Sequence, residues 1–118
     1  AYNGIQERAR ISKVSSDLST VTKKVELYTV DQGLYPATAT EVRATGAKMS
    51  TSAPDAAIYC GNATGFAVIT SEKDDHTGRQ FKIGKGIPLA EITPKLSWSG
   101  STLCASTPYP AILWSDLW

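Results

Sequence analysis

The chain has 118 residues, of which 42% are hydrophobic and 19% are charged, a composition typical of one soluble globular domain. Twelve basic and eleven acidic residues give a net charge of +1 at pH 7 and are scattered, which argues against a dedicated nucleic-acid-binding protein. The sequence contains no run of about 18 apolar residues, so no segment of it is expected to span a membrane. We therefore expect one domain over residues 1–118.

Apolar residues recur at intervals of three and four in the first third of the chain. They are Ile11, Val14, Leu18, Val21, Val25 and Tyr28. This spacing predicts an amphipathic helix with one buried face, because residues three and four apart lie on the same side of a helix. Towards the N-terminus the stripe fades at Glu7 and Gly4, where the helix would continue without a core beneath it. Since Thr, Val and Ser are mediocre helix formers, the stripe must pack on a flat partner to stabilise the helix.

The helix is expected to end at Asp31, Gln32 and Gly33, because glycine readily adopts the left-handed conformation that closes many helices. Pro36 then prevents the helix from continuing. Residues 35–57 contain prolines and many small residues, which predicts an irregular connection with one short helix at residues 40–47.

Strand-forming residues follow at 58–60, 66–70 and 81–83. Glycine and asparagine at residues 61–65 predict a turn between the first two strands. The polar residues 72–79, with Gly78 available for an unusual backbone angle, predict an antiparallel hairpin between the last two. Beyond residue 84 the prolines and glycines leave room only for short extended pieces, at residues 96–98 and near residues 112–114.

The two cysteines, Cys60 and Cys104, have neither CxxC spacing nor nearby histidines, which argues against zinc binding and thioredoxin-type chemistry. They form either a disulfide or two buried thiols. We favour the disulfide, because an even number of cysteines in a chain rich in Thr, Ser and Tyr fits an oxidising compartment. The protein is accordingly expected to be exported.

The segment from residue 10 to residue 36 resembles the helix that opens the soluble head of type IV pilins and of the major pseudopilins of type II secretion. Residues 13–18, KVSSDL, are similar to the helical block of that family. Residues 26–36, ELYTVDQGLYP, resemble its "LxxYxxDxGxYP" ending, whose Tyr, Asp, Gly, Tyr and Pro correspond here to Tyr28, Asp31, Gly33, Tyr35 and Pro36. The ending is the more specific part, because any amphipathic helix can imitate the helical block.

This resemblance implies an α+β pilin fold, in which a long N-terminal amphipathic helix packs on a small antiparallel sheet and a disulfide pins the loop-rich C-terminal region. It implies a structural subunit of a type IV pilus, anchored in the inner or cytoplasmic membrane before assembly and then part of an extracellular, homopolymeric filament. In that family an apolar half-helix precedes the head. Because residues 1–5 correspond to the junction, we expect this sequence to be a truncated form of a longer subunit.

Three other functions stay open. The first is a pseudopilin that pushes secreted proteins outward; the cysteine pair and the poor calcium loop favour a pilin over it. The second is a minor or competence pilin that binds DNA, against which the lack of clustered Arg and Lys argues. The third is a secreted binding domain or hydrolase of unrelated fold, which the helix ending disfavours.

No catalytic residue, cofactor or small-molecule substrate is expected. The only histidine, His76, lies in a polar loop without a nearby nucleophile and is interpreted as a solvated turn residue. Asp74 and Asp75 offer oxygen atoms to calcium, but these carboxylates do not alternate as in a calcium loop and Lys73 intrudes.

Asn62, Ala63 and Thr64 match the glycosylation sequon but are interpreted as a turn, since such triplets often arise by chance. The tryptophans at residues 98, 114 and 118 are expected to cover the sheet and the helix as core and rim. Trp118, the last residue, either docks on the domain or is exposed to a neighbouring subunit.

Overall fold

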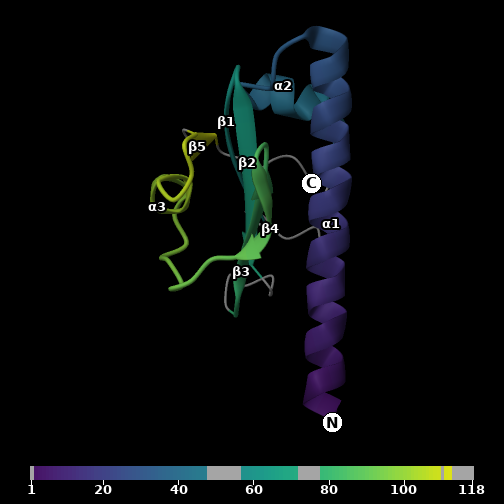
Figure 1. Ribbon diagram of the computed structural model, residues 1–118, viewed down its shortest axis with the longest axis vertical. Helices are drawn as coiled ribbons and strands as arrows, with labels where there is room; N and C mark the ends of the chain where they lie inside the picture. The colour runs from purple at the N-terminus through teal and green to yellow at the C-terminus, as the bar shows by residue number, and fades with distance from the viewer. Residues whose placement is uncertain (1, 48–56, 72–77, 110, 113–118) are drawn as a thin grey trace.

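The computed structural model describes residues 2–47, 57–71, 78–109 and 111–112. In chain order its elements are α1 (Tyr2–Gln32), α2 (Ala39–Ala44), β1 (Ala57–Asn62), β2 (Gly65–Ser71), β3 (Gln80–Gly84), β4 (Ile87–Glu91), α3 (Gly100–Cys104) and β5 (Ala111–Ile112). The expected α+β class is confirmed: one long N-terminal helix lies beside an antiparallel sheet (Figure 1).

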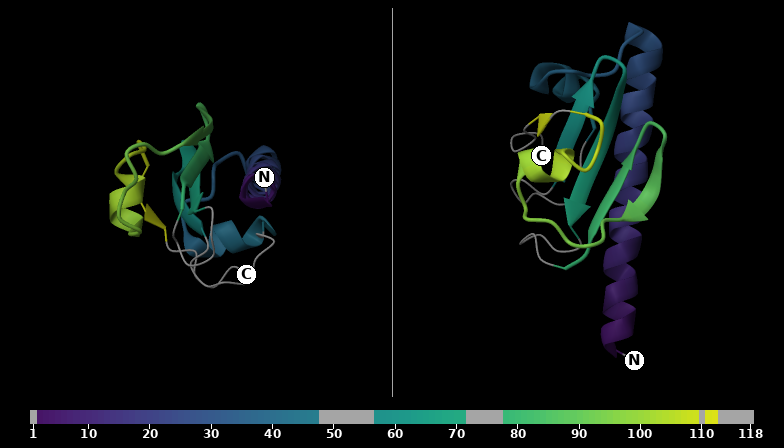
Figure 2. Two further views of the ribbon diagram at one scale, coloured as in Figure 1. Left: turned by 90° about the horizontal axis from the view of Figure 1, so that it is seen from below. Right: turned by 60° about the vertical axis from the view of Figure 1, so that its left-hand side comes forward.

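The strands are ordered β4-β3-β2-β1-β5, and every neighbouring pair is antiparallel. The four longer strands follow one another as a meander, and β5 adds two residues beside β1. The helices α1 and α2 cover one face of this sheet, whereas α3 covers the other (Figures 1 and 2). Three layers result, with the sheet in the middle.

The first hydrophobic core lies between the sheet and the two N-terminal helices. Its buried members are Val14, Leu18, Val21, Val25, Val42, Ala47, Ala57, Tyr59, Phe66, Val68 and Phe81. The strand members alternate along β1 and β2, because successive side chains of a strand point to opposite faces. Both faces of these two central strands are covered, so they are buried over nearly their whole length.

A second core fills the other face of the sheet. It consists of Ile58, Cys60, Ala67, Ile69, Ile92, Leu103 and Cys104. Leu96, Trp98 and Tyr109 are partly buried against it, so Trp98 covers the sheet as expected. The other two tryptophans lie outside the described residues.

The length of α1 sets the length of the molecule. A helix of 31 residues is about 46 Å long, and the longest dimension of the chain is 47 Å, against 25 Å and 24 Å for the other two. The N-terminal end of α1 projects beyond the sheet (Figure 1). The projecting part is where the apolar stripe fades, so the predicted continuation of the helix past its core is confirmed.

The short helix expected at residues 40–47 is present as α2, one residue earlier at its start and three shorter at its end. Thr38 caps it: its hydroxyl oxygen accepts a hydrogen bond from the backbone N–H of Glu41 at 3.2 Å and donates one to the Glu41 carboxylate at 3.1 Å. The first of these bonds gives a partner to a backbone N–H that the helix start would otherwise leave unpaired, which is the role of an N-cap residue.

The C-terminal third differs from the expectation in three respects. The strand β4 was missed because Pro88 suggested a break, but β4 is at the edge of the sheet, where a proline is tolerated. The expected extended piece at residues 96–98 is irregular, and the backbone of Leu96 bonds to a side chain instead of another strand. The helix α3 was not anticipated either. Of the extended piece expected near residues 112–114, only Ile112 in β5 lies within the described residues.

Candidate functional site

The predicted stripe of α1 is the face that packs on the sheet. Val14, Leu18, Val21 and Val25 are buried, and Ile11 is partly buried against the same core. Tyr28, the last member of the stripe, is half-buried, and its hydroxyl donates a hydrogen bond to the Glu41 carboxylate of α2 at 3.2 Å.

The Tyr28–Glu41 hydrogen bond ties the end of α1 to α2. Partial burial raises the pKa of the Tyr28 hydroxyl, and the hydrogen bond and negative charge of Glu41 raise it further. Tyr28 therefore stays protonated and can keep donating its hydrogen bond throughout the neutral pH range.

The ending of α1 is built as the sequence predicted. Gly33 has a φ of +81°, and its N–H donates a hydrogen bond of 2.8 Å to the carbonyl of Thr29. A side chain at this backbone conformation would be strained, which is why glycine closes the helix. Asp31, in the last turn of α1, is exposed to solvent.

Tyr35 docks this exit on the hairpin between β1 and β2. Its N–H donates to the carbonyl of Ala63 at 3.2 Å, and its ring lies 5.5 Å from the ring of Phe66. The ammonium of Lys85 lies 5.3 Å from the centre of the same ring and donates to the carbonyl of Thr64 at 2.9 Å. The chain leaving α1 is thus held to the hairpin tip by polar and aromatic contacts together.

Pro36 is buried, and its carbonyl accepts a hydrogen bond of 3.0 Å from the hydroxyl of Tyr59 in β1. The ring of Tyr59 stacks on Phe66 with 5.9 Å between ring centres. Burial raises the pKa of Tyr59 far above its usual value, with a smaller contribution from the charge of Glu41. Of the motif Asp31, Gly33, Tyr35 and Pro36, the last two therefore meet at the sheet, and Asp31 does not.

The hairpin tip itself is the turn expected at Asn62. Its side-chain oxygen accepts hydrogen bonds from the N–H of Thr64 at 2.9 Å, from the Thr64 hydroxyl at 2.7 Å and from the N–H of Gly65 at 3.1 Å. A Cβ at Gly65 would collide with the ring of Tyr109, so glycine is needed there for close packing. These contacts explain the Asn-Ala-Thr-Gly sequence by turn geometry.

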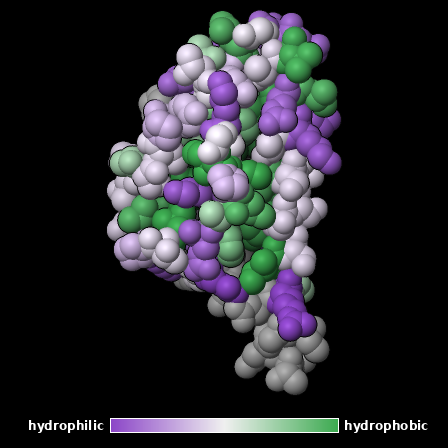
Figure 3. Space-filling view, viewed as in Figure 1, coloured by the Kyte–Doolittle hydropathy of each residue, from purple (hydrophilic) through white to green (hydrophobic). Residues whose placement is uncertain are grey.

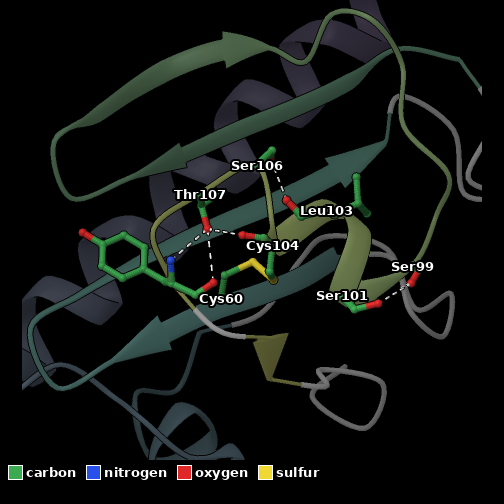
Figure 4. Close-up of a disulfide and its surroundings, with 8 residues drawn as sticks. Cys60, Ser99, Ser101, Leu103, Cys104, Ser106 and Thr107 are labelled. Carbon is green, nitrogen blue, oxygen red and sulfur yellow. Dashed lines mark hydrogen bonds between the residues drawn. A yellow bond between two sulfur atoms is a disulfide. The ribbon is translucent and has the colours of Figure 1, made fainter.

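The expected disulfide between Cys60 and Cys104 is confirmed. It joins β1 to the last residue of α3, with 5.6 Å between the two Cα atoms (Figure 4). The hydroxyl of Thr107 donates to the carbonyl of Cys104 at 2.8 Å and accepts from the N–H of Tyr109 at 3.2 Å. The disulfide and these hydrogen bonds fix the segment after α3 on the second core.

Sequence reasoning missed Gln80, a polar residue with 1% of its surface exposed. Its amide nitrogen donates to the carbonyl of Leu96 at 2.6 Å, and its amide oxygen accepts from the N–H of Leu96 at 2.9 Å. The Gln80 side chain thus replaces a neighbouring strand as the partner of this loop. Nothing in a single glutamine of the sequence signals such a role.

The exposed apolar residues at the C-terminal end of α1 were also missed. Leu27 and Val30 on α1 have 62% and 81% of their surface exposed, and Leu34, just beyond the helix end at Gln32, has 56%. Figure 3 shows hydrophobic side chains at this end of the helix, on the side turned away from the sheet. The three-residue spacing of Leu27 and Val30, offset from the buried stripe, is the signal that would have found these two, because it marks a second face of the same helix.

Among the described residues, no group of three His, Cys, Asp or Glu side chains comes together that could hold a metal ion. The calcium candidates Asp74 and Asp75, and His76, lie outside that part of the chain. No helix within it is both long enough and apolar enough to cross a bilayer. Comparisons of the chain with protein-family models, with curated proteins and with solved structures gave no match.

Proposed function

We propose that this chain is the head domain of a type IV pilin, a structural subunit that polymerises into an extracellular filament on the cell surface. The observation that carries the proposal is the combination of a long helix lying on an antiparallel sheet with a helix ending that docks on that sheet through Tyr35 and Pro36. The similarity of residues 26–36 to the pilin ending supports the same assignment.

The arrangement suits a rigid building block. The buried stripe of α1, the hydrogen bond from Tyr59 to Pro36 and the disulfide hold the helix, the sheet and the C-terminal segment together. The part of α1 beyond the sheet provides a stalk. A subunit whose work is mechanical needs such internal cross-connections and surfaces for its neighbours, and it needs no catalytic centre.

In this proposal the protein is anchored in the inner or cytoplasmic membrane before assembly, and its partners are further copies of itself. The full subunit would have about 25 apolar residues directly before Tyr2, preceded by a short basic leader with glycine at the cleavage site. The coding sequence upstream of this chain tests that requirement. A conventional cleavable signal peptide in that position would contradict the pilin assignment.

Filaments themselves provide the functional test. Deletion of the gene in its source organism is expected to abolish a class of surface filaments seen by electron microscopy, and an antibody against this chain should label those filaments along their length. Labelling only at the tips would indicate a minor subunit. Intact filaments combined with a loss of protein secretion would indicate a secretion pseudopilin instead.

A second measurement separates folding from assembly. Leu18→Asp in the full subunit should remove both the folded head and the filaments, since Leu18 is buried between α1 and the sheet. Lys24→Asp, at an exposed position of the same helix, is the matched control for expression and export. Normal filaments from the Leu18→Asp subunit would contradict a head built as described.

A further inference from the structure

The side chain of Asn62 has an amide nitrogen that the hairpin turn does not use. Its oxygen accepts hydrogen bonds from the N–H and the hydroxyl of Thr64 and from the N–H of Gly65. Because two of these partners are backbone N–H donors, the atom that faces them must be the oxygen of the amide and not its nitrogen. None of the residues that the structure describes accepts a hydrogen bond from that nitrogen.

Residue 64 is a threonine, although the turn does not need its hydroxyl. An Asx turn is closed by the asparagine oxygen and the backbone N–H two residues on, which any residue other than proline supplies. The Thr64 hydroxyl adds a further hydrogen bond of 2.7 Å to the same oxygen. The turn geometry is therefore satisfied before the hydroxyl is counted.

A hydroxyl two positions after an asparagine, with a residue other than proline between them, is the pattern of an acceptor for N-linked glycosylation. Asn62, Ala63 and Thr64 meet this requirement. The other asparagine of the chain, Asn3, is followed two positions on by Ile5 and does not. The sequence thus contains one such acceptor, and it coincides with the turn.

The turn lies on the surface, where acceptor asparagines of exported proteins are found. Ala63 and Thr64 are exposed, and Asn62 is half-buried as the last residue of β1. Figure 2 shows the turn between β1 and β2 at the end of the sheet where α1 stops, opposite the projecting N-terminal part of α1. The disulfide between Cys60 and Cys104 is typical of the oxidising compartments that exported proteins enter.

A sugar on the amide nitrogen is compatible with the turn. N-linkage replaces one hydrogen of that nitrogen and leaves the oxygen untouched, so the three hydrogen bonds that Asn62 accepts are retained. Because the two residues that follow Asn62 are exposed, a bulky hydrophilic group at this position extends into solvent and not into either core.

We propose that Asn62 is a site of N-linked glycosylation, modified during export by an oligosaccharyltransferase of the source organism. The amide nitrogen attacks the anomeric carbon of a sugar that is carried on a lipid diphosphate. A C–N bond forms, the bond from that carbon to the diphosphate oxygen breaks, and the lipid diphosphate leaves. The proton lost by the amide passes to a base of the transferase, and no oxidant or reductant takes part.

This inference goes beyond the proposed function, because it requires export of the chain and not its polymerisation. The test is mass spectrometry of the protein purified from its source organism. After reduction, alkylation and trypsin digestion, residues 49–73 form one peptide that contains Asn62. We expect this peptide to be heavier by whole hexose or N-acetylhexosamine units, with the added mass on Asn62 after fragmentation. A peptide found only at its unmodified mass would overturn the proposal.

Three variants expressed in the same organism locate the acceptor. Asn62→Asp keeps an oxygen for all three hydrogen bonds of the turn but has no amide nitrogen, so the added mass should be lost. Thr64→Ala keeps the amide and the backbone N–H but removes the hydroxyl, and it should lose the added mass as well. Thr64→Ser, the matched control, keeps a hydroxyl and should stay modified.

The remaining outcomes would overturn the proposal. Added mass that persists in Asn62→Asp would mean that the sugar is attached elsewhere, to a lysine by glycation or to a serine or threonine hydroxyl. Equal loss of the added mass in Thr64→Ala and Thr64→Ser would mean that the hydroxyl does not define the acceptor. Because residue 64 is exposed and residue 62 half-buried, the melts of all three variants by circular dichroism should stay close to that of the parent chain.

The two tests fail independently. An unmodified Asn62 would leave the filament test above unaffected. Conversely, a glycosylated Asn62 in an organism whose filaments survive deletion of the gene would uphold this inference and overturn the proposed function.

Discussion

At the scale of single residues, Tyr59 shows how one polar atom can be placed inside a core. Its ring is fully buried and stacks on Phe66, and its hydroxyl reaches the carbonyl of Pro36 in the segment that leaves α1. A buried carbonyl without a partner is costly. The hydroxyl of Tyr59 therefore holds the exit from α1 in position while its ring contributes to the core.

We expect Tyr59→Phe to destabilise the fold by about 1–2 kcal/mol, because it leaves the carbonyl of Pro36 without its donor while the ring still fills its place. Tyr28→Phe is the control: it removes a hydroxyl from a half-buried tyrosine whose partner, Glu41, remains accessible to water, so its loss should be smaller. Urea unfolding followed by circular dichroism measures both. Equal losses would show that the Tyr59 hydrogen bond is not special.

At the scale of elements, α1 depends on the sheet for its stability. Its sequence contains many Ser, Thr and Val residues, which have modest helix propensity, so the buried stripe must supply the stabilisation. Leu18 is at the centre of that stripe and is completely buried. Lys24, on the same helix, is exposed to solvent.

Leu18→Asp is accordingly expected to unfold the domain, with a loss of about 4 kcal/mol or more, because it buries an unpaired charge in the first core. Lys24→Asp should change the free energy of unfolding by about 0.5 kcal/mol or less. Thermal melts by circular dichroism compare the two. If both variants melt at the same temperature, the buried face of α1 has been assigned wrongly.

The segment around α3 depends on the disulfide for its stability, as α1 depends on the sheet. The helix has only five residues and the segment after it is irregular, so regular hydrogen bonds alone hold it weakly. The bridge links residues 44 positions apart, which in the chain-entropy model stabilises the fold by about 4 kcal/mol. The second core packs directly around the two cysteines.

Reduction of the disulfide should therefore lower the melting temperature by on the order of 10–15 °C. Hydrogen exchange should rise first in residues 100–109 and only weakly in α1, because the first core does not contain the bridge. Intact mass after alkylation confirms the redox state of each sample. Two free thiols in protein purified without reductant would contradict the bridge itself.

At the scale of the whole molecule, the 118-residue chain should be a monomer at micromolar concentration. The apolar stripe of α1 is already used by its own sheet, and the two exposed apolar side chains of α1, Leu27 and Val30, cover far less than the roughly 1,200 Å² or more that a stable interface buries. Sedimentation velocity measures the association state. A stable dimer or a fibre at micromolar concentration would mean that the head alone drives assembly, without the apolar half-helix proposed to precede it.

The sequence by itself determined the elements whose signals are local. The spacing from Ile11 to Tyr28 predicted the buried face of α1, and Gly33 and Pro36 predicted its end. The turn at Asn62 and the strands on either side of it were predicted from neighbouring residues in the same way. Such features depend on residues within a few positions of one another, so a single sequence contains the necessary information.

Only the tertiary structure decided features that depend on distant partners. Pro88 is compatible with a strand solely because β4 lies at the edge of the sheet, and Gln80 acts as a partner for Leu96 because folding brings them together across 16 residues. The second face of α1 became visible when Leu27 and Val30 proved to be exposed. Burial is a property of the assembled layers, and for that reason the exposed apolar side chains of α1 could not be separated with certainty from its core by the sequence alone.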